Sequence, residues 1–403
     1  MREQLHEART HTSLKQRPSG ACCAVLKSTG GGMLSLRTGA GGVRQYGNAD
    51  NAVTDADVWH LGSCGKAMTA TLAAVMVSRG LIPGGLEATV QQVCGKAGGT
   101  IKPLASFHAA YGPVTLRQLL THTGLLPGAA SGASLKLAWR MDPHIRRTLL
   151  NGNLGPRKSM PVQRAKFLAA VMQDAPAHDD AAAALARGQY EYSNQGYTLA
   201  GHMLELCSDT PYERLLVDLL FKPLGMTSAG FGPPGAPDDV SMPGGWMTEL
   251  VGDATVSGFP WGHGEQTGWD AKDPRKGGAD NPSSITPAGR VHATMADWAA
   301  FIAVHIDKEA AQSLLGIDNE GFASMHAKHE PSTESYCAAG FFVCDRPWQR
   351  GGLCLNHAGS NAMNYCSVWA TEGAASLVTS NNGGCGDIVE VAHGQMIENQ
   401  MFS

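Results

Sequence analysis

The sequence predicts an α+β fold in which one antiparallel sheet is built from both ends of the chain. Segments that alternate apolar and polar residues lie before residue 62 and again after Tyr336, whereas helical periodicity dominates between them. The 50 glycines and 21 prolines imply many turns, which suits a mixed fold better than a helical bundle. With 403 residues, the chain is long enough to bury a sizeable core.

The chain divides into an N-terminal extension, residues 1–19, and a single domain over residues 20–403. Within this domain we expect a sheet subdomain at about residues 20–110 and 290–403, and a helical cap subdomain at about residues 111–289. No internal repeat or low-complexity linker indicates a further domain boundary.

The first strands are expected between glycine-rich breaks, at Ala21–Leu26, Met33–Leu36 and Val43–Tyr46. A helix over Ala67–Arg79 follows, because apolar residues recur there at helical spacing. Gly80 then suits the left-handed conformation that commonly ends a helix.

The middle of the chain shows helical periodicity and several N-capping patterns. The expected helices are Val114–Leu126 with Thr115 as its cap, Trp139–Leu150, Pro161–Asp174, Tyr197–Cys207, and a helix from Thr210 to about Phe221 in which Glu213 completes a capping box. Residues 233–284 are rich in glycine and proline and carry Trp246, Trp261 and Trp269. We expect this stretch to be an irregular excursion, of a kind that often forms binding loops.

The last part of the chain returns to strands after one more helix. A capped helix is expected over Thr294–His305 and a closing helix over about Asp387–Gln400. The strands expected between these helices are Ala338–Cys344, Leu353–His357, Tyr365–Ala370 and Ala375–Thr379.

The composition narrows the class of protein. The net charge of −4 and the lack of interleaved basic and aromatic stretches argue against a nucleic-acid partner. The ten cysteines are scattered and form no Cys-x-x-Cys pair, so we expect reduced thiols. The N-terminus is polar without an apolar signal region, and no apolar run reaches membrane-spanning length. A cytoplasmic location is therefore expected for the chain as given, and a trimmed secreted or periplasmic protein would look the same.

Ser63 and Lys66 are the strongest candidates for chemistry. At a spacing of three residues, the two side chains share one helical face, so the amine can take the proton of the hydroxyl. Ser63 also lies at the helix N-terminus, where free N–H groups favour negative charge. The alternative is an ordinary N-cap serine followed by a solvated lysine, and this pair therefore needs partners elsewhere in the chain.

Two further segments supply candidate partners. In Tyr192-Ser193-Asn194, the phenol can relay a proton, and the amide can hold a substrate carbonyl or fix Lys66. The alternative is a half-buried tyrosine followed by an ordinary helix cap. In His357-Ala358-Gly359-Ser360, the glycine allows close approach to the backbone. The N–H of Ser360 can then join that of Ser63 in an oxyanion hole.

These three motifs, in this order, resemble those of the class C β-lactamase-like serine hydrolases, which include β-lactamases, D-Ala-D-Ala peptidases, family VIII esterases and related amidases. The resemblance covers roughly residues 20–400 and extends to other segments typical of the family. These segments are Leu116–Leu125, Tyr192–Tyr197, Phe221–Met226 and Asn356–Asn382. The resemblance implies the penicillin-recognising serine hydrolase fold.

The resemblance also implies a role for each candidate residue. Ser63 takes the place of the acylated nucleophile, Lys66 of its base and Tyr192 of the proton shuttle. The remaining matches are Asn194 for the contact to the substrate amide, His357 and Gly359 for the third motif, and Ser360 for the second oxyanion donor. No metal or cofactor is implied. The reaction would be acylation of Ser63 with loss of an alcohol or amine, followed by attack of water.

Several features depart from the family's β-lactamases. His357 stands where those enzymes carry lysine, and a histidine is charged only in part near neutral pH, which favours esterase, amidase or peptidase work. The Ala-rich insertion at residues 128–188 is long for the family, and we expect specificity to lie there and in the tryptophan-bearing excursion. Cys64 is a rival nucleophile, but its position points away from the face shared by Ser63 and Lys66.

Two other enzyme classes are excluded by their motifs. Leu61 stands where a Gly-x-Ser-x-Gly elbow requires glycine, so the α/β-hydrolase interpretation fails. His326–Glu330 does not have zinc-protease spacing, and we expect it to form a polar helix face.

The leading hypothesis is a serine hydrolase that cleaves a small ester or amide through an acyl-enzyme on Ser63. One alternative is an acyltransferase that uses the same residues with an acceptor other than water. The other is a catalytically silent member that binds ligands or acts as a scaffold. The natural substrate and the oligomeric state do not follow from the sequence.

Overall fold

The computed structural model describes residues 20–30, 33–95, 98–128, 130–142, 159–234, 258–263, 271–272, 280–329, 334–349 and 352–401. The N-terminal extension, most of the expected helix Trp139–Leu150 and most of the excursion at residues 233–284 lie outside these ranges. Among the described residues, no helix is both long and apolar enough to cross a bilayer.

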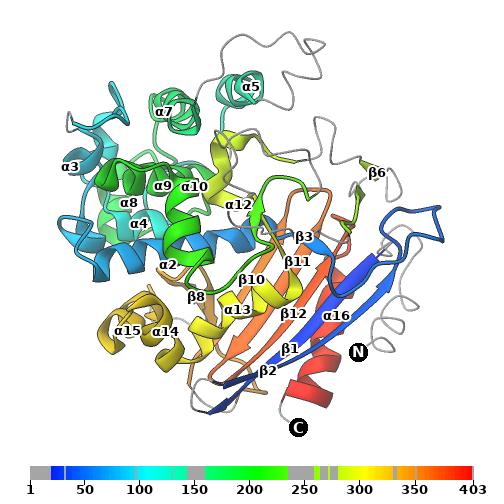
Figure 1. The fold of residues 1–403 in the computed structure, drawn as a ribbon. Coiled ribbons are helices and arrows are strands. Elements are labelled where there is room, and N and C mark those ends of the chain that lie inside the picture. The colour runs from blue at the N-terminus through cyan, green and yellow to red at the C-terminus, as the bar shows by residue number, and fades with distance from the viewer. Residues whose placement is uncertain are drawn as a thin grey trace.

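A seven-stranded antiparallel sheet, in the order β2-β1-β12-β11-β10-β9-β8, combines strands from both ends of the chain. Its strands are β1 (Gly20–Gly30), β2 (Met33–Gly42), β8 (Glu334–Tyr336), β9 (Phe342–Cys344), β10 (Cys354–Ser360), β11 (Tyr365–Thr371) and β12 (Ala374–Ser380). Figure 1 shows the blue N-terminal strands beside the orange C-terminal ones. The predicted α+β fold is confirmed.

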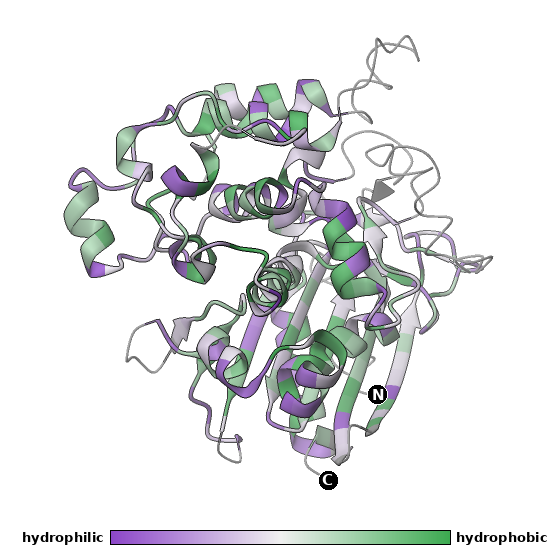
Figure 2. Cartoon of the chain, turned by 60° about the vertical axis from the view of Figure 1, so that its left-hand side comes forward, coloured by the Kyte–Doolittle hydropathy of each residue, from purple (hydrophilic) through white to green (hydrophobic). Residues whose placement is uncertain are grey.

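The sheet is covered by helices on both faces. The covering helices are α2 (Gly65–Ser78), α13 (Met295–Ile306) and α16 (Gly386–Met396). In β1, Cys22 and Leu26 join the core that contains α2 and α13, whereas Cys23 and Val25 pack with α16. Burial of both faces explains the nearly continuous apolar run in this strand. Figure 2 shows apolar residues along the strands and on the helices over them.

The remaining helices gather mainly on the side of α2 away from the sheet (Figure 1). They are α3 (Val90–Cys94), α4 (Leu116–Leu120), α5 (Gly132–Met141), α7 (Met160–Val171), α8 (Ala181–Arg187), α9 (Asn194–Ser208), α10 (Tyr212–Leu216) with a π-helical turn over Val217–Phe221, α12 (Thr286–Gly289), α14 (Lys308–Leu315) and α15 (Asn319–His326). The described part of the chain also contains two small sheets. Their strands are β3 (Val58–His60), β7 (Val291–Thr294) and β4 (Gly230–Phe231) in one, and β5 (Gly262–His263) and β6 (Ala271–Lys272) in the other.

Several local predictions are confirmed by their contacts. Thr115 caps α4 and forms the capping box with Gln118, and Thr294 caps α13 by accepting from the N–H of Asp297. Gly80 adopts a φ of 67° just after α2. All ten cysteines are free thiols.

The expected strand Val43–Tyr46 is wrong. The strand β2 continues through the glycines to Gly42, and Val43 makes only an isolated bridge to Ala52. The glycines favour a break in the sequence, but β1 supplies backbone partners along their whole length, so the ladder does not need side chains there.

The expected helix Val114–Leu126 is too long. The helix α4 ends at Leu120, because the chain turns at His122, which has a φ of 61°. The backbone N–H of Ser193 donates to the ring of His122, so a tertiary contact holds this turn against the local helical preference.

The capping box at Thr210 is also wrong. Pro211 itself is the N-cap, and α10 begins at Tyr212. The carboxylate of Glu213 pairs instead with the buried guanidinium of Arg164 on α7. Charge pairing in the core therefore takes the side chain away from the helix end.

Two further predictions near the C-terminal half need correction. Only Phe342–Cys344 of the expected strand Ala338–Cys344 is a strand, because the preceding residues form a turn in which Gly340 has a φ of 81°. The expected polar helix face at His326 is a helix end. Its ring is buried and lies 3.0 Å from Nδ1 of His305, so this histidine belongs to the core.

Arg164 offers a test of what holds the helical region together. Its fully buried guanidinium pairs with Glu205 on α9 and with Glu213 on α10. We expect Arg164→Ala to lower the free energy of unfolding by about 3–5 kcal/mol in urea titrations, because it leaves two carboxylates buried without their cation. The matched control is Arg214→Ala, which breaks a partly exposed pair with Asp218 and should cost less than about 1 kcal/mol. Equal losses for the two variants would contradict this account.

Candidate active site

Ser63 lies in a tight turn between a strand and the central helix. The strand β3 ends at His60, the backbone N–H of Leu61 donates to Val291, and a 3₁₀ turn over Gly62–Cys64 leads into α2. Gly62 has a φ of 46°, and a Cβ atom there would lie 2.5 Å from the backbone nitrogen of Ser360. A side chain at this position would therefore push the turn over Gly62–Cys64, which carries Ser63, away from β10.

Lys66 is fully buried one helical turn after Ser63. Its Nζ lies 3.0 Å from Ser63 Oγ, 2.7 Å from Asn194 Oδ1 and 2.6 Å from the backbone oxygen of Ala288. Burial lowers the pKa of Lys66 to about 7, although the nearby Cys64 thiol opposes the shift. The amine is thus poised between its charged and neutral forms near neutral pH.

The partners of Lys66 direct its lone pair. The oxygens of Asn194 and Ala288 can only accept, so a neutral amine uses its two N–H groups on them. The third direction then faces Ser63 Oγ, whose proton the lone pair can take. This arrangement is the one that a general base needs.

Tyr192 lies beside this pair in the loop before α9. Lys66 Nζ lies 4.8 Å from the centre of its ring, and the side chain of Ser63 is close enough to the phenol to oppose the rise in its pKa. Burial raises the pKa of Tyr192 well above its ordinary value, so the phenol stays protonated at neutral pH. The group can therefore donate a proton and recover one from Lys66.

His122 holds the tyrosine loop from behind. Its ring stacks on Tyr192 with centroids 4.3 Å apart, and its Nδ1 accepts from the backbone N–H of Ser193 at 2.9 Å. Its own carbonyl accepts from the N–H of Glu191 at 2.7 Å. His122 lies in the family-like segment Leu116–Leu125, but nothing local in the sequence shows which loop its ring will meet.

The third motif lies at the end of β10, against the nucleophile turn. A Cβ atom on Gly359 would lie 2.3 Å from the carbonyl oxygen of Leu61 and 2.9 Å from the backbone nitrogen of Cys64. Only glycine lets the two backbones approach this closely. The contact brings the peptide of Ser360 beside the turn that carries Ser63, which is the placement that two oxyanion donors require.

His357 is buried, with 2% of its surface exposed. Its Nδ1 lies 2.6 Å from the carbonyl oxygen of Ala358 and its Nε2 lies 3.0 Å from the hydroxyl of Tyr336. Both ring nitrogens are therefore engaged within the protein. Ala288 and Tyr336 are thus contacts of the site that the sequence analysis did not identify. One acts through its backbone and the other from a strand that was not predicted.

Cys64, between Ser63 and Lys66 in the sequence, is buried against β10 and β11. Its sulfur lies 3.5 Å from that of Cys366 on β11 and 3.4 Å from the carbonyl oxygen of His357. Burial alone would raise the pKa of this thiol, but hydrogen bonds with Cys366 and His357 lower it to about 6. Its 2% exposure leaves little room for a substrate.

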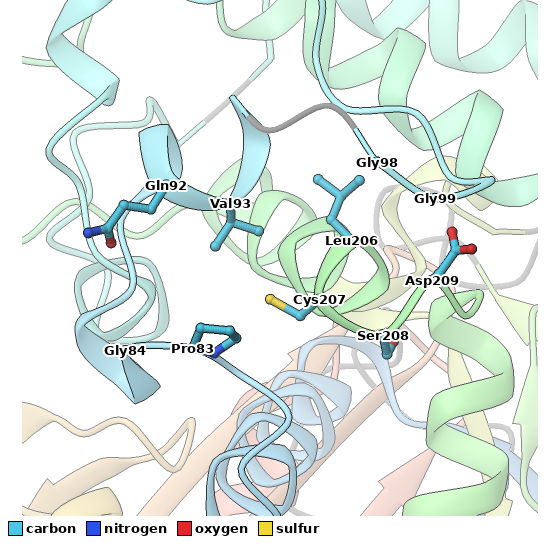
Figure 3. A pocket seen from close by; sticks show the side chains of 10 residues that line it. All are labelled: Pro83, Gly84, Gln92, Val93, Gly98, Gly99, Leu206, Cys207, Ser208 and Asp209. Carbon is cyan, nitrogen blue, oxygen red and sulfur yellow. The ribbon is translucent and has the colours of Figure 1, made fainter.

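A cavity of about 730 Å³ lies elsewhere, beside α3 and the C-terminal end of α9 (Figure 3). Its most prominent polar group, the carboxylate of Asp209, is already engaged by the N–H groups of Thr100 and Ile101. None of the nucleophile, base or tyrosine residues lines this cavity.

Comparison with known proteins assigns most of the chain to a family. Residues 24–381 match the beta-lactamase family. A search of curated proteins finds no significant sequence match.

Three solved structures illustrate the similarity of fold. An octameric penicillin-binding protein homologue from Pyrococcus abyssi has a TM-score of 0.64 at 19% identity, over 99% of this chain and 77% of its own. SurE with D-Leu has a TM-score of 0.66 at 18% identity, over 98% of this chain and 73% of its own. A D-stereospecific amidohydrolase from Streptomyces sp. has a TM-score of 0.64 at 16% identity, over 100% of this chain and 98% of its own.

The fold and the family match together define the class of protein. The sheet from both chain ends and the helical region are those of the penicillin-binding-like fold. Because the family match spans most of the chain, the protein belongs to the beta-lactamase family.

The pKa of Lys66 predicts how labelling of Ser63 depends on pH. Only the neutral amine accepts a proton, so the rate of reaction with a fluorophosphonate should rise with pH through about 7 and level off above it. The rate is measured from about pH 5 to about pH 9. In Lys66→Ala the reaction should be slow, and its rate should not rise through this pH range. An unchanged rise of the rate with pH in that variant would assign the titration to another group.

Proposed function

We propose that this protein is a serine hydrolase that cleaves small esters or amides through an acyl-enzyme on Ser63. The observation that carries the proposal is the buried amine of Lys66, which lies 3.0 Å from Ser63 Oγ while two carbonyl oxygens occupy its other directions. A lysine held in this way serves as a base more readily than as a surface charge.

In the acylation step, Ser63 Oγ forms a bond to the substrate carbonyl carbon as its proton passes to Lys66. The backbone N–H groups of Ser63 and Ser360 stabilise the oxyanion of the tetrahedral intermediate. The bond to the leaving group then breaks. Tyr192 donates its proton to the departing oxygen or nitrogen and recovers one from Lys66, so the site returns to its starting protonation.

Deacylation runs the same transfers with water in place of the leaving group. Water attacks the ester carbonyl on Ser63 as its proton passes to the Tyr192–Lys66 pair. Cleavage of the acyl bond then returns a proton to Ser63 Oγ and releases a carboxylic acid. The steps require no group beyond these side chains and the two backbone donors.

The engagement of His357 supports substrates without a carboxylate next to the scissile bond. A penicillin presents such a carboxylate, for which a fixed cation is useful, but both nitrogens of this ring already have partners. We therefore expect turnover of a chromogenic short-chain ester to exceed that of a chromogenic cephalosporin by at least about tenfold in kcat/KM, or about 1.4 kcal/mol. Comparable values for the two substrates would contradict this choice of substrate.

The acyl-enzyme itself is tested by trapping. A fluorophosphonate should add one adduct to the wild-type chain, and peptide mass spectrometry should locate it on Ser63. The adduct should be absent in Ser63→Ala and retained in Cys64→Ala, which is the matched control for the neighbouring thiol.

Tyr192→Phe should lower kcat for an ester by about 10²–10⁴-fold, because it removes the proton relay.

Four outcomes would overturn the proposal. Equal labelling of wild type and Ser63→Ala would show that Ser63 is not the nucleophile. An adduct on Cys64 would show that this thiol is the nucleophile instead. No turnover of any ester or amide by a folded wild-type protein would favour a silent binding member of the family. If added alcohols or amines divert the product from acid to ester or amide, the protein is an acyltransferase that uses the same acyl-enzyme.

A further inference from the structure

Asp280 is a buried carboxylate close to the site that the mechanism above does not use. Its side chain is 3% exposed and precedes the 3₁₀ turn over Ser283–Ile285, which leads into α12. Burial raises the pKa of Asp280, but His60 and Arg290 outweigh this effect and hold it well below its usual range. Asp280 is therefore a buried anion, and buried anions need several donors.

The donors come from separate parts of the chain. Asp280 Oδ2 lies 3.0 Å from His60 Nε2 and 3.2 Å from Arg290 Nε. Oδ1 accepts from Asn361 Nδ2 at 3.1 Å and from the backbone N–H of Asn281 at 2.7 Å. One carboxylate thus joins the end of β3, the start of β7 and the turn after β10.

The histidine arm of this network leads directly to the nucleophile turn. His60 Nδ1 accepts from the backbone N–H of Gly62 at 3.0 Å, so this nitrogen carries no proton. The proton of the neutral ring is then on Nε2, which donates to Asp280. Through this tautomer, the carboxylate orients the peptide that precedes Ser63.

The asparagine arm leads to the other side of the proposed oxyanion hole. Asn361 follows Ser360, and its Oδ1 accepts from the backbone N–H groups of Met363 at 3.1 Å and Asn364 at 2.8 Å. Its amide therefore fixes the turn after β10, while its Nδ2 ties that turn to Asp280.

The arginine arm leads to the lysine. Arg290 follows Gly289, where a Cβ atom would lie 2.7 Å from the carbonyl oxygen of Gly62. The residue before Gly289 is Ala288, whose carbonyl oxygen accepts from Lys66 Nζ. The three arms therefore end on the base and on both backbones that would bind the oxyanion.

We propose that Asp280 is a positioning residue that sets the separation of the Ser63 and Ser360 backbone N–H groups through His60 and Asn361. The inference rests on the proposed function, because those two groups act only if Ser63 is acylated. Asp280 does not touch substrate. It acts on the oxyanion hole in the way that a buried carboxylate orients the histidine of a serine protease triad.

Asp280→Asn tests this role because it keeps the shape of the side chain and removes its charge. For a short-chain ester we expect kcat to fall by about 10–100-fold, less than the removal of a whole oxyanion donor would cost, while KM changes less than about threefold. The inhibition constant of a boronic acid, whose tetrahedral adduct uses the same N–H groups, should weaken in parallel with kcat. Hydrogen exchange should rise in the peptide that contains Gly62 and Ser63, with or without turnover.

Variants of His60 separate positioning from general loss of stability. His60→Asn places an amide near the Nδ1 position, so it can keep the contact to Gly62 while losing Asp280. His60→Gln reaches toward Asp280 and loses Gly62. Both should lower kcat and weaken boronate binding as Asp280→Asn does. The double variant Asp280→Asn/His60→Asn should be no worse than the poorer single variant, because both break one relay.

Failure of the Asp280 proposal can be distinguished from failure of the proposed function. If wild type is not labelled on Ser63, the proposed function fails, and exchange at Gly62 still reports whether Asp280 holds the turn. If wild type is labelled and turned over but Asp280→Asn keeps its kcat, boronate affinity and exchange, the positioning role is wrong. If Asp280→Asn does not fold, normal kcat and boronate affinity in folded His60→Asn and His60→Gln would overturn it.

Discussion

The buried amine of Lys66 is the contact on which the rest of the site depends. An ammonium group in a protein core is costly unless acceptors surround it, and here they come from the nucleophile turn, the start of α9 and α12. Asn194 and Ala288 are far apart in the sequence, so the helical region must fold onto α2 before the amine is satisfied. The same burial that requires these partners also lowers the pKa of the amine. Burial of Lys66 therefore both holds the surrounding elements together and makes the amine a better base at neutral pH.

A second constraint is the contact between two backbones from opposite ends of the chain. Because β1 pairs with β12, the strands that follow Tyr336 lie in the same sheet as the first residues of the domain. The end of β10 then meets the turn at Ser63 without intervening side chains, since Gly62 and Gly359 leave no room for a Cβ atom. The Asp280 network lies beside this contact and joins it to the lysine. The residues that we propose as nucleophile, base and backbone oxyanion donors are therefore positioned by one compact group of buried contacts.

Predictions from the sequence succeeded where the deciding interactions are local. The N-caps of α4 and α13 involve residues three apart, and the late strands show their alternation directly. Predictions failed where distant partners overrode a local preference. Glycines up to Gly42 stay in a strand because β1 pairs with them, His122 turns the chain because Ser193 donates to it, and Glu213 leaves its helix end for Arg164.

The sequence by itself determined the α+β architecture and the identity of the candidate residues Ser63, Lys66 and Tyr192, because periodicity and motif spacing are properties of neighbouring residues. Only the tertiary structure decided which groups surround them. The carbonyl of Ala288, the ring of His122 and the carboxylate of Asp280 have no distinctive sequence pattern, and they contribute because folding places them beside the motif residues. The tertiary structure also turned His357 inward, since a ring's hydrogen-bond partners depend on the neighbouring strands and not on its own motif.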